Sequence, residues 1–473
     1  TPYSIPDSGT FNCLATTRVV WDIGALQALL TVPAGSATCS NLGREPWTYT
    51  PSPDGGNTGT NVILRSANGS NWLINGAGEI QTIPDLGTYG CLAAANPVIW
   101  NTPGTKINDW RPIGATPATC GGGTGASARI AAGDHHTCAI VAGGQVNCWG
   151  VNWGSEHPDG ALNHRTIPVP VNGITGATAI AAGWNHTCAI VAGGEVRCWG
   201  ENSTGQLGDG STTPKSVPAR VSGISGATAL SAGWDHTCVI LSGGEVKCWG
   251  SNYFGQLGDG TTTDSAAPVK AIVTGITGAT ALALKAYDTC AIVTGGQVKC
   301  WGSYGSHLGD GKTPVTIADI SGATALAAGT DDACAIVTGG QVKCWGQNYG
   351  GPLGDLTKPV TIAGMPPAYA LDDGIPVQPE HHTCVIVTGG AIMCWGTNSS
   401  GEVGDGSNIE RTSPTIASGI TGATDITIGL NHVCAVISGG QVQCWGGNRY
   451  GQLGDGTTTD RNKPVEVKGL TVP

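Results

Sequence analysis

The chain has 473 residues, of which 77 are glycine and only 12% are charged. Its formal net charge of −11 disfavours a nucleic-acid partner, because an acidic surface repels the phosphate backbone. No apolar run approaches the roughly 20 residues of a membrane-spanning helix. The composition is neither the charge-rich one of disordered chains nor the leucine-rich one of helix bundles.

The chain contains 18 cysteines, an even number that is regularly spaced over most of its length. Such a pattern favours disulfides, and therefore an extracellular or cell-surface location rather than the reducing cytoplasm. Because the sequence begins at Thr1 rather than Met, we also expect a secreted product whose signal segment has already been removed.

Residues 1–122 are predicted to form a small β-rich domain that is stapled by disulfides and has no internal repeats. The run at 19–30 fits one short helix, and residues 61–83 fit β-hairpins. Four cysteines permit three pairings, and proximity in sequence favours Cys13–Cys39 and Cys91–Cys120. We expect this domain to serve anchoring or self-assembly, and the glycine-rich segment at 121–125 to be a flexible junction.

Residues 126–473 repeat one line seven times, in which Cys, nine residues and Cys-Trp-Gly follow one another. Successive copies start 44 to 52 residues apart. A period near fifty residues indicates a closed or stacked array of one supersecondary unit.

One copy, residues 176–223, divides into four short strands and a loop rich in Gly, Asp and Thr. Four strands per unit are typical of a propeller blade. The sequence therefore predicts an all-β protein, a seven-bladed β-propeller preceded by the small N-terminal domain. Crowding at the axis leads us to expect only Gly, Ala, Ser and Thr on the innermost strands.

The hairpin register follows from the first copy. Pairing Ile140 with Val146 places Cys138 opposite Cys148, and the three-residue loop at 142–144 supplies glycine where φ must be positive. Zinc is disfavoured because C-x9-C is not the spacing of structural zinc sites. The predicted disulfides are Cys138–Cys148, Cys188–Cys198, Cys238–Cys248, Cys290–Cys300, Cys334–Cys344, Cys384–Cys394 and Cys434–Cys444.

The long form of the repeat, at His236–Thr261 and His432–Thr457, resembles the repeat of the regulator of chromosome condensation family. The resemblance covers residues 126 to 473 and implies a seven-bladed propeller. Members of that family include a nuclear nucleotide-exchange factor, a secreted bacterial inhibitor of beta-lactamases and extracellular bacterial proteins. The paired cysteines and acidic charge depart from the nuclear members, so the resemblance implies the secreted bacterial type. The sequence does not fix how the propeller is closed.

Three recurring side chains receive structural interpretations. The Trp after each second Cys is predicted to fill the space between blades. The Asp of each Leu-Gly-Asp-Gly is predicted to cap a turn rather than bind calcium. Five histidines stand two residues before a first Cys, each in a different blade, and we predict buried hydrogen bonds to neighbouring backbone for them rather than a metal site. They are His136, His186, His236, His382 and His432.

In each copy, the residues just before the position occupied by these histidines vary, and so do the residues that follow Trp-Gly. On a fixed scaffold, exposed aromatic residues on rigid turns are typical of recognition surfaces. We expect the first set to surround one mouth of the central channel. The candidate ligand-binding residues are His135, Trp184, Trp234, Tyr287, His381, Trp153, Tyr253, Tyr349 and Tyr450.

No nucleophile–base constellation stands out, so we expect neither an enzyme nor a bound cofactor or metal. The favoured function is an extracellular binding or adhesion protein that presents a rigid loop face to a protein or glycan on a cell or particle surface. Two alternatives stay open. One is a structural subunit of a surface filament, sheath or virion assembled through residues 1–120. The other is a secreted inhibitor resembling the propeller-type beta-lactamase inhibitor.

Overall fold

The structure is a computed structural model of the chain, and the residues it describes are 129–151, 164–269, 273, 275–302, 311–329, 332–347, 355–374 and 381–473. At 347 and 355–357, and in five strands before residue 84, only the backbone is described. The chain divides into two compact units, Thr1–Pro112 and Ile113–Pro473, each of which is described by itself. Within the described ranges, no helix is long and apolar enough to cross a membrane.

In the first unit, two strands replace the helix predicted for residues 19–30. Strand β1 (Arg18–Ile23) pairs antiparallel with β2 (Leu26–Thr31). The helix prediction is wrong because the β-branched Val19 and Val20 favour extended backbone, and because Gly24 interrupts a helical run.

The hairpins predicted for residues 61–83 are confirmed. Strands β3 (Val62–Arg65), β4 (Asn71–Ile74) and β5 (Ile80–Ile83) form one antiparallel sheet. The two disulfides predicted for this region involve residues outside the described ones, namely Cys13, Cys39, Cys91 and Cys120.

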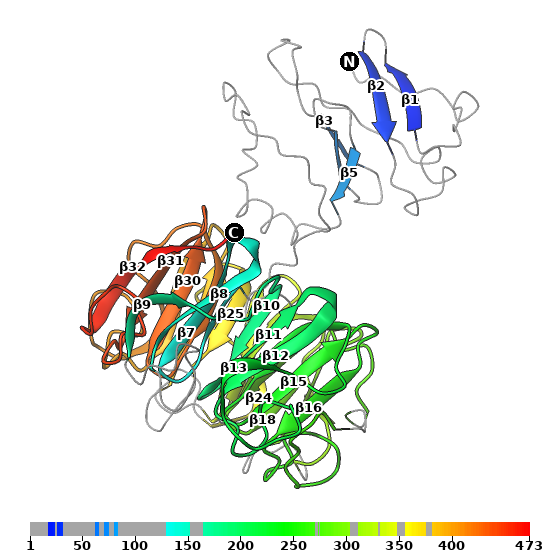
Figure 1. The fold of residues 1–473 in the computed structure, drawn as a ribbon. Coiled ribbons are helices and arrows are strands. Elements are labelled where there is room, and N and C mark those ends of the chain that lie inside the picture. The colour runs from blue at the N-terminus through cyan, green and yellow to red at the C-terminus, as the bar shows by residue number, and fades with distance from the viewer. Residues whose placement is uncertain are drawn as a thin grey trace. The chain divides into compact units, whose positions relative to one another are not determined.

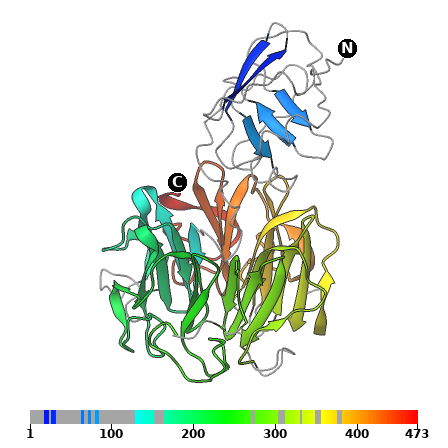
Figure 2. The same cartoon turned by 90° about the vertical axis from the view of Figure 1, so that its right-hand side faces the viewer.

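The second unit is a ring of seven antiparallel sheets, the blades, numbered here in chain order (Figures 1 and 2). The innermost strands are β6 (Ile130–Ala132), β10 (Ala179–Ala182), β14 (Ala227–Ala232), β17 (Ala281–Lys285), β21 (Ala323–Ala328), β25 (Ala368–Asp373) and β29 (Ala423–Ile428). The second strands are β7 (His136–Val141), β11 (His186–Val191), β15 (His236–Leu241), β18 (Asp288–Val293), β22 (Asp332–Val337), β26 (His382–Val387) and β30 (His432–Ile437).

The two outer positions of each blade complete the sheets. The third strands are β8 (Gln145–Gly150), β12 (Glu195–Gly200), β16 (Val246–Gly250), β19 (Gln297–Gly302), β23 (Gln341–Gln347), β27 (Ala391–Gly396) and β31 (Gln441–Gly446). The outermost strands are β9 (Arg165–Pro170), β13 (Lys215–Arg220), β20 (Val315–Thr316), β24 (Asp355–Thr361), β28 (Arg411–Ile416) and β32 (Arg461–Thr471). In the third blade a single bridge, Gly250 with Ser265, takes the outermost place.

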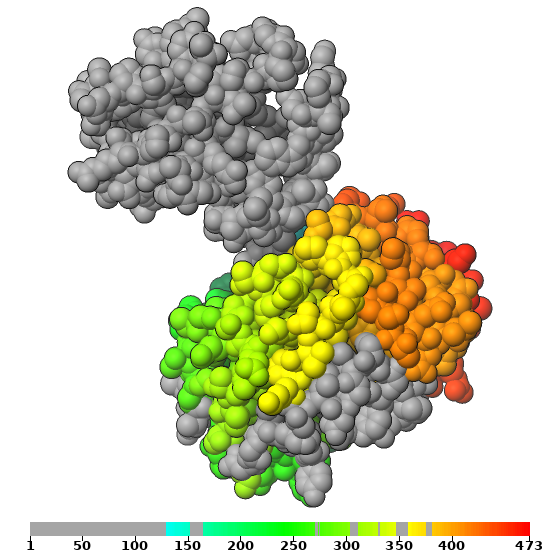
Figure 3. All heavy atoms as spheres, turned by 180° about the vertical axis from the view of Figure 1, so that it is seen from behind, coloured from blue at the N-terminus to red at the C-terminus, as the bar shows by residue number. Residues whose placement is uncertain are grey.

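The ring closes without exchange of strands between the chain ends. Each blade is built from one continuous segment, because its strands are consecutive in sequence and in the sheet. The innermost strands β29 and β6 lie side by side, as do the innermost strands of other neighbouring blades. On the face that Figure 3 shows, consecutive segments of this unit lie side by side, from green through yellow and orange to red. The seventh and first blades therefore meet as two complete blades.

The predicted hairpin register and all seven disulfides of the repeats are confirmed. Ile140 lies opposite Val146 and Cys138 opposite Cys148. The loop between them, η2 (Ala142–Gly144), has a φ of 77° at Gly143, and η3 (Ala192–Gly194) repeats this turn in the second blade. In every pair the Cα atoms are 4.1 Å apart.

Three motifs of the repeat meet at the seams between blades. Between the second and third blades, Nε2 of His186 lies 2.9 Å from Oγ1 of Thr237, whose hydroxyl donates to the carbonyl of Gln206 at 3.1 Å. The same carbonyl accepts from Nε1 of Trp249 at 2.9 Å. Because the hydroxyl proton is directed at Gln206, the Thr237 oxygen accepts from the imidazole. We call this chain of bonds the seam relay.

The seam relay recurs where the third blade meets the fourth and where the seventh meets the first. Its members there are His236, Thr289, Gln256 and Trp301, and His432, Thr137, Gln452 and Trp149. The histidines are buried and hydrogen-bonded as predicted, but their Nε2 partner is a threonine hydroxyl of the next blade rather than backbone. The tryptophans are buried between blades, as predicted.

The Leu-Gly-Asp-Gly loop belongs to the same seam. A Cβ on Gly208, whose φ is +67°, would lie 2.6 Å from Nε1 of Trp249, so the tryptophan ring requires a glycine there. Oδ1 of Asp209 accepts from the backbone N–H and the hydroxyl of Ser211 at 2.8 and 2.7 Å. The predicted turn cap is confirmed here, and also at Asp259, Asp405 and Asp455.

The innermost strands depart from the prediction that only small residues fit at the axis. Lys285, Asp372, Asp373 and Asp425 are all buried on them. Nζ of Lys285 lies 3.9 Å from Oδ1 of Asp372 and donates to the carbonyl of Ile428 at 3.2 Å. The prediction is wrong because side chains from opposite sides of the ring reach one another and pair across the axis.

A small cavity remains on that axis between the innermost strands. It is lined by residues such as Ala131, Ala181 and Leu230 together with Lys285 and Asp372. It offers about 30 Å³ to the centres of water molecules, and one water needs roughly 10–15 Å³ on that scale. The axis therefore has room for water at this place.

Candidate functional site

The turns between the first and second strands of each blade lie at one mouth of the ring, and backbone hydrogen bonds join several of them. The N–H of Asp134 donates to the carbonyl of Trp184 at 3.3 Å, and that of Trp184 to the carbonyl of Trp234 at 3.3 Å. The N–H of Trp234 donates to the carbonyl of Ala286 at 3.3 Å, and the N–H of Leu430 donates to the carbonyl of Asp134 at 3.2 Å. Five blades thus hold their turns in fixed relative positions.

Five aromatic side chains from three blades form a continuous row on these turns and on an adjacent loop. Ring centroids are 4.4 Å apart for Trp184 and Trp234 and 4.9 Å apart for Trp234 and Tyr287. Phe254 lies 4.6 Å from Tyr287 and 4.9 Å from Tyr253. Such contacts add about 0.5–1.5 kcal/mol per pair beyond burial. We call these five residues the aromatic row.

The row is partly exposed. Tyr253 is 74% exposed at one end, while the other four members are of intermediate exposure. Nε1 of Trp184 donates to Oδ2 of Asp134, which fixes the indole at the other end. The aromatic row therefore presents preoriented ring surface to solvent.

Acidic groups lie beside the row. Burial raises the pKa of Asp134 to about 6, although the hydrogen bond from Trp184 opposes the shift. Burial, with the charges of Glu201 and Asp264, also raises the pKa of Asp235 to about 6. Gln206 donates to Oδ1 of Asp235 at 3.1 Å. Near neutral pH the row is therefore flanked by negative charge that diminishes in mild acid.

A second cluster lies where the first and seventh blades meet. The ring of Tyr450 is 4.7 Å from that of His135 and 4.9 Å from that of His164, and the guanidinium of Arg449 is 5.6 Å from its centroid. Burial lowers the pKa of His135 to about 4, with contributions from the charges of Arg449 and His164. His135 is therefore neutral near pH 7.

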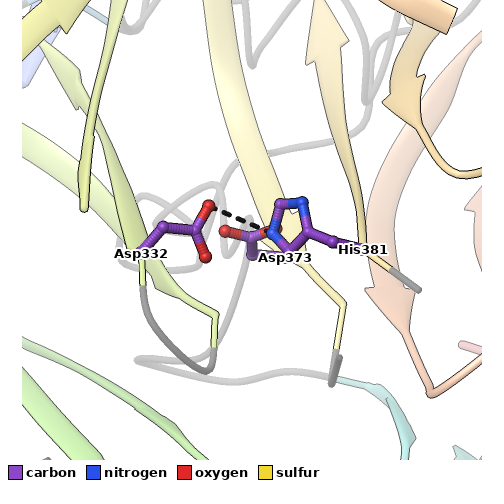
Figure 4. Close-up of side chains that lie close together, drawn as sticks. All are labelled: Asp332, Asp373 and His381. Carbon is purple, nitrogen blue, oxygen red and sulfur yellow. Dashed lines mark ion pairs between the residues drawn. The ribbon is translucent and has the colours of Figure 1, made fainter. Parts of the chain in front are cut away.

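His381 lies apart from both clusters. It is buried rather than exposed, and its Nε2 is 3.0 Å from Oδ2 of Asp332 and 3.1 Å from Oδ1 of Asp373 (Figure 4). Burial lowers its pKa, but the charges of the two aspartates outweigh this effect and hold the pKa well above its ordinary value. The prediction that His381 is exposed on a recognition surface is therefore wrong.

The structure brings most of the predicted candidates together. Trp184, Trp234, Tyr287 and Tyr253 share the aromatic row, and His135 and Tyr450 share the second cluster. Two further candidates, Trp153 and Tyr349, lie outside the described residues. Sequence reasoning did not select His164 because it lies in the irregular loop of the first copy, where the Leu-Gly-Asp-Gly motif is missing. Phe254 follows the candidate Tyr253 in sequence, and it could have been selected because its position varies between copies of the repeat.

The ring of seven antiparallel sheets, with aromatic residues on the turns at one mouth, defines a seven-bladed β-propeller. Two profiles of the Regulator of chromosome condensation (RCC1) repeat match the chain, one at residues 128–152, 177–206, 227–256 and 423–452 and the other at 193–240 and 439–472. The matched segments of the chain are therefore RCC1 repeats.

Solved structures share the fold at low sequence identity. Human WBSCR16 is 19% identical with a TM-score of 0.59, and the match covers 65% of this chain and 86% of that one. Prp20p from Saccharomyces cerevisiae is 20% identical with a TM-score of 0.59, covering 73% and 88%. Yeast RCC1 (Prp20) bound to Kap60 is 18% identical, also at 0.59, covering 79% and 91%. A search of curated protein sequences found no match.

Proposed function

We propose that this propeller is a non-enzymatic binding protein whose aromatic row contacts a protein partner. The observation that carries the proposal is the row itself, in which five rings touch in sequence on turns tied together by backbone hydrogen bonds. Tryptophan and tyrosine dominate the energetics of protein interfaces. Rings already fixed before binding lose little conformational entropy when a partner arrives.

The surroundings favour a partner with basic residues. Asp134 and Asp235 lie beside the row, Glu201 lies near Asp235, and the whole chain carries a net charge of −11. Charge complementarity around an apolar centre steers association and selects among partners. Protein binding also accords with the descriptions of relatives of this fold, since Prp20p is described by its binding to Gsp1p and histones.

The proposal includes an extracellular or cell-surface setting. Each of the seven repeat hairpins carries a disulfide, and disulfides of this density persist in oxidising compartments. Mass spectrometry of the protein from its source, alkylated before lysis, tests this setting. Free thiols at the repeat cysteines would place the protein in a reducing compartment.

Site-specific photo-crosslinking tests the contact surface. A photoreactive phenylalanine analogue replaces Tyr253 in one protein and Ile416 in another, since Ile416 is 59% exposed on the outer strand β28. Surface proteins of the source organism serve as the probe. We expect one defined adduct from position 253, none from position 416, and loss of the adduct when Trp234→Ala is added.

A direct measurement then follows with the purified partner. Tyr253→Ala should weaken binding by at least about 10-fold, since one aromatic anchor contributes roughly 1–2 kcal/mol or more. Because Tyr253 is exposed, this variant keeps the fold. Equal crosslinking from positions 253 and 416 would overturn the proposal. Binding to a glycan array that Tyr253→Ala abolishes would replace the protein partner by a carbohydrate.

A further inference from the structure

The seam between the fifth and sixth blades differs from the seams that carry the relay. At the place of the relay histidine the fifth blade has Asp332, and the sixth blade adds Asp373 at the end of its innermost strand. The hydroxyl of Thr383, the threonine of this seam, donates to Oδ1 of Asp373 at 2.8 Å. An imidazole and two carboxylates from two blades therefore meet where the relay histidine and threonine meet elsewhere.

These three side chains converge on a common point. One ligand atom from each of Asp332, Asp373 and His381 lies within 4.8 Å of the others, and all three residues are buried. Figure 4 shows the imidazole edge and the two carboxylates directed toward one another. Among the described residues, Nε2 of His381 has no partner with hydrogen-bond geometry, although both carboxylates are near it.

We propose that Asp332, Asp373 and His381 bind a divalent transition-metal cation, with zinc as the first choice, across the seam between the fifth and sixth blades. Zinc binds imidazole nitrogen and carboxylate oxygen at roughly 2.0–2.2 Å, which places neighbouring ligand atoms of a tetrahedral site about 3.3 Å apart. The nitrogen–oxygen distances of 3.0 and 3.1 Å are close to that separation.

Charge supports the same conclusion. Two buried carboxylates beside an imidazole form a site that favours a cation, because buried negative charge is costly unless it is paired. Lys285 is the nearby cation, but it is paired with Asp372. A divalent cation with a neutral imidazole balances the two carboxylates. The mixed nitrogen and oxygen donors favour zinc over calcium, which takes six to eight oxygen ligands.

The first blade supplies a matched comparison. The sequence His-His-Thr-Cys occurs at 135–138 and again at 381–384. His135 and His381 therefore hold equivalent positions in the repeat, and the carboxylate near His135 is that of Asp134, at 3.6 Å between Nε2 and Oδ2. The two aspartates distinguish the seam between the fifth and sixth blades, so His135→Gln is the control for His381→Gln.

The experiment uses the full oxidised chain, stripped with EDTA and titrated with Zn²⁺ alone by calorimetry. We expect one site per chain, and loss of affinity by more than about 100-fold in Asp373→Asn and His381→Gln, since even outer-shell changes at metal sites cost 10–100-fold. His135→Gln should bind as the unchanged protein does. Saturating Zn²⁺ should raise the midpoint of thermal unfolding of the unchanged protein and not of His381→Gln.

Cobalt gives a readout that does not depend on the variants folding. Co²⁺ added to the stripped, unchanged protein should give the visible absorption of a tetrahedral nitrogen–oxygen site, which Zn²⁺ then displaces. No site-specific zinc uptake and no cobalt spectrum would overturn the proposal and leave a histidine bridging two aspartates. Zinc uptake retained in His381→Gln would assign the metal to other residues and overturn it equally.

Discussion

Nε2 of His186 in the second blade lies 2.9 Å from Oγ1 of Thr237 in the third, and both residues are fully buried. This bond joins two blades that share no strand. It also explains why histidine, threonine, glutamine and tryptophan recur together in the long copies, because the four contribute to one seam relay. A seam that lacks one member loses part of the chain of bonds.

A substitution at the seam between the sixth and seventh blades should make the protein more stable. Val433 stands in the place of the relay threonine, and Nε2 of His382 has no hydrogen-bond partner among the described residues. Val433→Thr should raise the free energy of unfolding by about 0.5–1.5 kcal/mol, because it gives His382 an acceptor and lets the hydroxyl donate to Glu402. Denaturant unfolding measures the change.

The reverse change is the control. Thr237→Val removes the acceptor of His186 and should lower the free energy of unfolding by about 1–3 kcal/mol. If Val433→Thr destabilises the protein as much as Thr237→Val does, the relay is not what holds neighbouring blades together.

The buried histidines predict a pH dependence with a defined sign. Burial lowers the pKa of His236 to about 3, and the charge of His186 acts in the same direction. The unfolded chain takes up a proton near the ordinary histidine pKa of about 6.5. The stabilisation from neutral His236 is therefore complete above that pH and decreases as the pH falls toward 3. Between pH 7.5 and 5, the stability advantage over His236→Gln should shrink by about 2 kcal/mol.

Asp425 should show the opposite sign in the same experiment. Burial raises its pKa to about 7, so the folded protein holds a proton that the unfolded carboxyl releases above its ordinary range. The stability relative to Asp425→Asn should fall as the pH rises from 4 to 7. Parallel slopes for His236→Gln and Asp425→Asn would contradict both assignments.

The ion pair on the axis predicts a non-additive double variant. Lys285→Met leaves the carboxylate of Asp372 buried without its cation and should cost about 3–5 kcal/mol. Adding Asp372→Asn removes the uncompensated charge and should recover most of the loss. Chemical unfolding of the two single variants and the double variant measures the coupling, and strictly additive effects would mean that the pair does not interact.

Removal of one disulfide should cause a moderate loss of stability that is confined to its own blade. Cys188→Ala with Cys198→Ala opens a loop closed over a sequence separation of 10, and should lower the free energy of unfolding by about 2–3 kcal/mol in the chain-entropy account. The other blades keep their own disulfides, so the ring should stay folded. An unchanged denaturation midpoint would show that the bond contributes no stability.

The repeat line was sufficient to predict blade number, hairpin register and disulfides, because each depends on the repeat count or on contacts within a single repeat. The partners across a seam are different. His186 and Thr237 are 51 residues apart, and their contact depends on how one blade packs on the next. Sequence reasoning placed the histidine in a hydrogen bond but did not identify its partner.

The charged residues on the innermost strands could have been recognised in the sequence as exceptions to the repeat. Asp372, Asp373 and Lys285 stand where other copies have uncharged residues. These substitutions marked the axis pair and the cluster around His381. Their contact across the ring follows only from closure, which the sequence did not specify. The aromatic row was predicted as residues on one mouth, but not as rings in contact, for the same reason.

Arg129 begins the first blade and its guanidinium donates to the carbonyl of Pro473 beyond the last strand. The first and last blades thus meet at one junction, and this junction carries the same seam relay as the junctions on either side of the third blade. A circularly permuted gene, opened at any other junction and joined here by a short linker, should encode the same ring. Force applied at residues 129 and 473 would likewise load this single junction and peel the first blade from the seventh.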